Sequence, residues 1–112
     1  MMKNYNGAGD QLELIAPADG VIAGKPVLIG ALVVIPMTTA ASSEPFIGYR
    51  CGEYTVPVAL TGAVTQGAKA YLKSDGSAIT GTASGNTLVG AFLADLASDA
   101  ADGLVLFTGQ IA

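Results

Sequence analysis

Residues 58–111 read VALTGAVTQGAKAYLKSDGSAITGTASGNTLVGAFLADLASDAADGLVLFTGQI, and this stretch decides the fold class. Short apolar segments alternate there with Gly, Ser, Thr, Asn and Asp, which favour turns. The segment Ser74–Ser77 predicts a hairpin, because Asp-Gly readily adopts the backbone of a tight turn. Short strands at close spacing are typical of barrels and sandwiches. We therefore predict an all-β protein, a small antiparallel β-barrel or sandwich that is jelly-roll-like.

The upstream sequence extends this pattern. Residues 11–16 alternate polar and apolar side chains, as a half-buried strand does. Residues 27–29 and 32–35 are apolar throughout and flank Gly30-Ala31, so they predict two strands that are covered on both faces. Residues 1–10 are polar and predict an extended N-terminal arm, which leaves 11–112 as a single β-domain. One or two helical turns near residues 93–101 are the alternative to an irregular connection there.

Composition limits the classes of partner. The chain has 112 residues, a net charge of −4 and only five Lys and Arg residues, which are scattered. Nucleic-acid binding normally needs clustered cations, so we expect no nucleic-acid partner. The longest apolar run, residues 27–37, is about half the length of a membrane span, so we expect no membrane partner. Charged residues make up 12%, half the usual share, which indicates a surface rich in Ser, Thr, Gly and Ala, a surface partly covered by another subunit, or a mixture of both.

Catalysis and cofactor binding both lack their usual residues. Histidine is absent, which removes the commonest general base and metal ligand, and Cys51 is the only cysteine. Residues 20–26 have one residue too few between their glycines for a phosphate-binding loop, and Pro26 replaces its hydroxyl residue. Three carboxylates at 95, 99 and 102 lack the spacing of a calcium loop, so we read them as a solvated turn. We expect no enzyme, no metal and no cofactor.

A family resemblance extends over nearly the whole chain. The matching segments are ALTG at 59–62, TQGAKAY at 65–71, GNTLVG at 85–90 and GLVL at 103–106. In this order and spacing the sequence resembles the small capsid cement, or decoration, proteins of tailed phages. Leu72 and Lys73 depart from the pattern, because relatives often carry Trp and an acid after the Tyr.

The resemblance implies a structural virion protein. Such a protein decorates the outside of the capsid and stabilises it by bridging subunits of the major capsid protein, after synthesis in the bacterial cytoplasm. It implies self-association as a homo-oligomer, a dimer or trimer. The arm is the expected contact with the shell, through Lys3, Asn4, Tyr5 and Asn6. An aromatic residue in a polar arm often anchors a partner, although Tyr5 packed against the protein's own sheet is the alternative, and an extended arm can add a strand to an exposed sheet edge. The loop at residues 37–45 is the second candidate contact.

Two alternatives come from other classes. A swivelling β-domain carrier protein is suggested by Lys73 beside its hairpin, since such domains carry a modified lysine at a hairpin tip. A small hydrolase would need an activated Cys51, Ser42 or Ser43, and no histidine is present to activate them. Another non-catalytic interaction module remains the broader alternative.

Overall fold

The computed structural model describes residues 11–109, and within that range it is all-β, with nine strands and no helix. The strands are β1 (Gln11–Ile15), β2 (Val27–Ile29), β3 (Leu32–Pro36), β4 (Pro45–Tyr49), β5 (Gly52–Pro57), β6 (Lys69–Leu72), β7 (Ile79–Thr80), β8 (Thr87–Phe92) and β9 (Asp102–Phe107). The predicted all-β class is confirmed. The segment at 93–101 is an irregular connection in which Leu96 forms one bridge with Val64.

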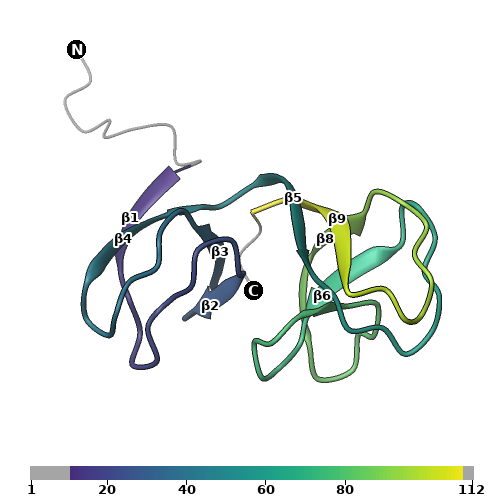
Figure 1. Ribbon diagram of the computed structural model, residues 1–112, viewed down its shortest axis with the longest axis horizontal. Coiled ribbons are helices and arrows are strands. Elements are labelled where there is room, and N and C mark those ends of the chain that lie inside the picture. Colours follow the sequence, from purple (N-terminus) through teal and green to yellow (C-terminus); the bar gives the residue numbers. More distant parts are fainter. Residues whose placement is uncertain (1–10, 110–112) are drawn as a thin grey trace, which may run out of the picture.

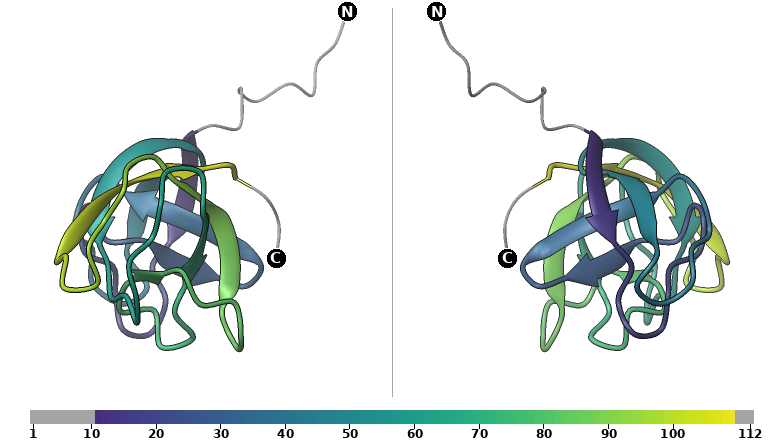
Figure 2. Two further views of the ribbon diagram at one scale, coloured as in Figure 1. Left: turned by 90° about the vertical axis from the view of Figure 1, so that its right-hand side faces the viewer. Right: turned by 90° about the vertical axis from the view of Figure 1, so that its left-hand side faces the viewer.

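The strands form two antiparallel sheets. The N-terminal sheet has four strands in the order β1-β4-β3-β2, and the C-terminal sheet has five in the order β5-β9-β8-β6-β7. The sheets lie next to one another along the long axis of the molecule (Figure 1) and overlap when the molecule is viewed along that axis (Figure 2). The chain passes from the first sheet to the second through the short link between β4 and β5.

The sheets are not closed into a barrel, which corrects the barrel form of the prediction. The nearest approach to closure is one isolated parallel bridge between Val58, just beyond β5, and Ile79 in β7. The Ala59 N–H donates to the Ile79 carbonyl at 2.9 Å there. A closed barrel would need a continuous ladder of paired residues between these two segments, and a single bridge does not supply one. Strand β7 is only two residues long. The jelly-roll-like connectivity stays a prediction.

Three strand prolines show how the sequence fits the ladders. In antiparallel pairs, every second residue directs its backbone N–H away from the paired strand. The Met37 N–H donates to Ile47 and the Val58 N–H donates to Ala101, so Pro36 and Pro57, one residue earlier, stand at positions where the ladder needs no donor. Pro45 stands at such a position too, because the ladder bond there is made by the residue before it: the Ala16 N–H donates to the Glu44 carbonyl. No ladder bond is lost at these prolines.

Strand β3 joins two hydrophobic clusters. Val33 and Ile35 belong to the larger cluster, which the C-terminal sheet fills with residues such as Phe92 and Phe107. Val34, on the opposite face of β3, belongs to the smaller cluster with Phe46. The prediction that residues 32–35 are covered on both faces is confirmed. In β2, by contrast, Leu28 is exposed, because that strand lies at the edge of its sheet.

Candidate functional site

Cys51, the candidate thiol nucleophile, lies in a link whose neighbouring side chains make hydrogen bonds to the backbone. Cys51 is half-buried in the link between β4 and β5, where its carbonyl accepts a hydrogen bond from the Tyr54 hydroxyl at 2.9 Å. Burial, together with Cys51 and Tyr49, raises the pKa of Tyr54, so its phenol stays protonated and acts as a donor. The Arg50 guanidinium donates to the Gly109 carbonyl at 2.8 Å. Together these contacts fix the link rather than assemble a reactive group.

The carboxylates near the last connection act in turns. Asp95 accepts a hydrogen bond from the Gln66 N–H at 2.8 Å and so ties the segment before β6 to the connection between β8 and β9. Within residues 11–109, no group of three or more His, Cys, Asp or Glu side chains is placed to hold a metal ion. The same residues include no helix long and apolar enough to cross a membrane.

Lys73 lies at the base of its hairpin and not at the tip. The Gly76 N–H donates to the Lys73 carbonyl at 2.8 Å, which closes the predicted turn between β6 and β7. Asp75 accepts hydrogen bonds from the Ser77 N–H and hydroxyl, at 3.0 and 2.7 Å. The Ser77 hydroxyl chiefly lowers the pKa of Asp75. The hairpin is confirmed, but Lys73 is half-buried, whereas a carrier lysine has to project from the tip.

A shallow apolar surface covers one side of the N-terminal sheet. We call it the β1–β4 face, and it consists of Glu13, Ile15, Met37, Pro45 and Ile47. Glu13 pairs with Ile47 and Ile15 with Pro45 across the two strands. Ile15 is 60% exposed and Met37 46% exposed. A groove of about 380 Å³ runs along this face, lined by most of these residues with Thr38 and Phe46. Exposed apolar area of this kind marks contact surfaces.

Strand β1 adds an open backbone edge beside this face. Among the described strands, β1 pairs with β4 alone. Ala16 donates toward β4, so the alternate residues Gln11, Glu13 and Ile15 direct their N–H and C=O groups to the free edge. Such an edge accepts an added strand. The predicted contact residues Lys3, Asn4, Tyr5 and Asn6 lie outside the described residues, but they directly precede this strand in sequence.

The loop at 37–45 borders the β1–β4 face and is held by the backbone. Val21 and Ala40 exchange two hydrogen bonds of 2.9 and 3.1 Å, and Ala16 exchanges two more with Ser43 and Glu44. Ala40 is buried in the smaller cluster. The loop is therefore anchored near its middle and presents Met37 and Thr38 from a defined position.

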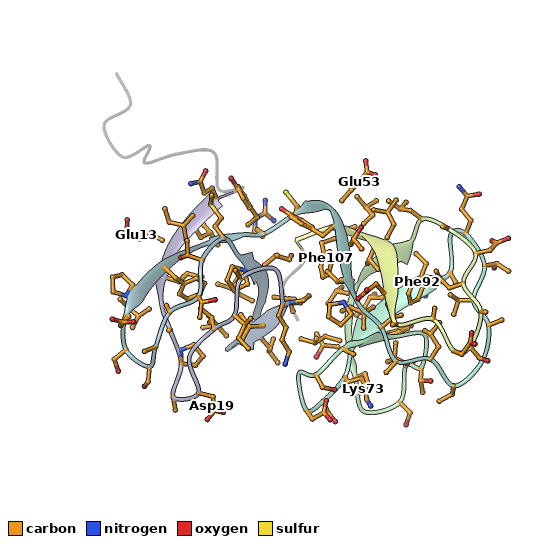
Figure 3. All side chains as sticks on the ribbon, in the orientation of Figure 1. Glu13, Asp19, Glu53, Lys73, Phe92 and Phe107 are labelled. Atoms are coloured by element: carbon orange, nitrogen blue, oxygen red, sulfur yellow. The ribbon has the colours of Figure 1, made fainter. Side chains whose placement is uncertain are left out.

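A second hollow, of about 450 Å³, lies between the turns of the two sheets. Its walls come from the segment that joins β1 to β2 and from the hairpin at Ser74–Gly76. Figure 3 shows Asp19 and Lys73 on the same, lower side of the molecule. Its lining mixes backbone turns with Ile22, Lys25 and Leu28, and Asp75 already serves its own turn. This hollow separates the two sheets and offers no arrangement for chemistry.

The β1–β4 face and the free edge of β1 are therefore the surfaces of this all-β protein that best suit contact with a partner. Comparison with protein families agrees: a family model described as phage cement protein matches residues 7–107, nearly the whole chain. The chain belongs to this family, which makes it a structural, non-enzymatic protein of the phage capsid. No curated protein and no solved structure matches the chain significantly. The suspected family is confirmed.

Sequence reasoning named the 37–45 loop as a candidate contact, which stays a prediction, and did not single out the rest of the β1–β4 face. One signal was available. In the segment at 11–16, Leu12 and Leu14 face the smaller cluster, so Ile15 stands at an outward position where the alternation calls for a polar side chain. The placement of Ile47 and Pro45 beside it depends on the register of β1 and β4, which the sequence does not reveal.

Proposed function

We propose that this protein decorates the outer surface of the phage capsid and stabilises the shell by bridging subunits of the major capsid protein. The observation that carries the proposal is the β1–β4 face, an exposed apolar surface beside the free edge of β1, in a member of the cement family. The N-terminal arm and this face form one continuous contact region in the proposal. The protein self-associates, as a dimer or trimer, and is made in the cytoplasm of the bacterial host.

Physical considerations favour this role. A shell offers many copies of the same site, so a bridging protein with two modest contacts gains avidity from their combination. The groove along the β1–β4 face accepts an apolar side chain, while Glu13 at its margin favours a basic neighbour on the shell. An arm that adds a strand to a sheet edge gains main-chain hydrogen bonds without any need for a large interface.

The test is decoration of purified expanded shells that lack this protein, measured by co-sedimentation. We expect deletion of residues 1–6 to leave a folded protein that no longer sediments with shells. Ile15→Asp should weaken binding roughly tenfold or more, because it places a carboxylate in the apolar contact. Ile22→Asp is the matched control: Ile22 is 58% exposed but lies in the hollow between the sheets, so it should bind normally.

Circular dichroism of each variant separates loss of binding from loss of folding. Full decoration by the truncated protein would remove the arm from the proposal. Equal effects of Ile15→Asp and Ile22→Asp would remove the β1–β4 face, and no binding of the unaltered protein to any shell would overturn the proposed function.

A further inference from the structure

The outer face of the C-terminal sheet carries one row of side chains with opposite charges at its ends. Glu53 in β5 pairs with Leu106 in β9, Leu106 pairs with Ala91 in β8, and Ala91 pairs with Lys69 in β6. Their strand neighbours Val105, Phe107, Ala70 and Phe92 are buried, so the row faces outward. Figure 3 shows Glu53 directed away from Phe92 and Phe107. An acid and a base thus flank an apolar centre.

The adjacent row continues this apolar centre. Leu104 in β9 lies two residues from Leu106, and its carbonyl accepts a hydrogen bond from the Leu93 N–H at 3.0 Å. Leu104 and Leu106 are 37% and 36% exposed, in the middle of a sheet rather than at its edge. An antiparallel sheet with one solvated face normally places polar residues at such positions. Here two leucines occupy them, so this face is built to be covered.

Glu53 and Lys69 cannot pair with each other within one chain. Three strand spacings separate β5 from β6, which is roughly 14 Å at about 4.8 Å per spacing. A two-fold axis parallel to the strands, between β8 and β9, resolves this separation. It places Glu53 of each copy over Lys69 of the other, Leu106 over Ala91, and Leu104 over Leu93. The same patch then serves both copies, as an isologous interface requires.

We propose that two copies of this chain dimerise face to face through the outer face of the C-terminal sheet. The inference deepens the self-association included in the proposed function by naming its surface and symmetry. Sheets pack in this way about 10 Å apart, within reach of Glu and Lys side chains from the two layers. The leucines supply the apolar contact, and the two Glu–Lys pairs fix the orientation. The β1–β4 faces of both copies stay free for the shell.

Charge reversal tests the symmetry directly. Glu53→Lys makes both ends of the row basic, and Lys69→Glu makes both ends acidic, so each variant alone places like charges together across the axis. We expect each to weaken dimerisation roughly tenfold in analytical ultracentrifugation at low salt. An equimolar mixture of the two variants should form heterodimers, and the double variant should recover the original affinity, because both restore the opposite-charge pairs.

Leu104→Lys tests the apolar contact and should leave the protein monomeric at concentrations where the unaltered chain is dimeric. Its control is Ile22→Lys on another surface, where the side chain is 58% exposed and so tolerates a charge at least as well; this variant should remain dimeric. Circular dichroism shows whether each variant folds. A monomeric unaltered chain, or charge reversals that the mixture does not rescue, would overturn this dimer. If Leu104→Lys leaves the dimer intact but abolishes shell decoration, the face binds the shell instead of a second copy. Decoration is measured separately, so a monomeric chain would count against the proposed self-association but not against the proposed decoration of the capsid.

Discussion

At the scale of single residues, the turn before β2 depends on one glycine. Pro17 and Gly20 stand at the ends of a four-residue turn, in which the Gly20 N–H donates to the Pro17 carbonyl at 2.8 Å. Gly20 has a φ of 72°, and a Cβ there would lie 2.6 Å from the Ala40 carbonyl oxygen. Gly24 has nearly the same backbone, with a φ of 77°, but a Cβ there would meet nothing within 4 Å.

This pair separates backbone strain from steric clash. We expect Gly24→Ala to lower the free energy of unfolding by about 1 kcal/mol, the cost of a left-handed backbone for an L-residue. Gly20→Ala should lower it by about 3 kcal/mol, because the added methyl also pushes Ala40 away from its bridge with Val21. Chemical denaturation of the two variants measures both values. If both variants lose the same free energy of unfolding, the loop at 37–45 moves to accommodate the added methyl at no cost.

At the scale of elements, local pattern predicted the strands well because most of them alternate or end at turn residues. The hairpin at Ser74–Ser77 needed only Asp-Gly chemistry, and β3 was recognisable from its unbroken apolar run. The apolar segment LVLF at 104–107 is typical of a strand, but its outward leucines were not singled out. A continuous apolar segment does not indicate which side chains are buried. Here the register of β9 with β5 and β8 shows which of them lie on the outer face.

The hairpin between β6 and β7 should give a pH dependence. Hydrogen bonds from Ser77 lower the pKa of Asp75 below its ordinary value of 3.8, so the ionised carboxylate stabilises the fold above about pH 4. That contribution disappears as the pH falls through the lowered pKa. We expect the difference in Tm between the unaltered protein and Asp75→Asn to shrink on acidification. Asp99→Asn changes the net charge equally on another exposed turn and serves as the control. A difference that widens at low pH would contradict the assignment.

At the scale of the whole molecule, the sequence did not predict that the strands divide into two open sheets. Strand order depends on pairs far apart in the chain, such as β1 with β4 and β5 with β9. Short strands with similar apolar content carry little information about which edges meet. The arm contact stays a prediction, because Lys3 to Asn6 lie outside the described residues. The face beside the arm became visible only once β1 and β4 were paired.

The joint between the sheets bears on whether residues 11–112 act as a single domain. Val34 packs in the smaller cluster while its neighbours Val33 and Ile35 pack in the larger one. The Tyr54 ring lies 6.5 Å from the Tyr49 ring and 5.9 Å from the Phe107 ring, measured between centroids, and so bridges the sheets. Neither cluster can lose its structure without disturbing strand β3, so the two sheets should unfold together.

We therefore expect one calorimetric transition, with a van't Hoff enthalpy equal to the calorimetric enthalpy. Val34→Ala, in the smaller cluster, should cost about 2 kcal/mol and lower the Tm of the whole transition by roughly 10 °C. Leu28→Ala, on the exposed side of β2, is the control and should shift it much less. Two resolved transitions, of which Val34→Ala moves only one, would show that the sheets are separate folding units. A cooperative response would mean that a load applied at the β1–β4 face is carried by the C-terminal sheet as well.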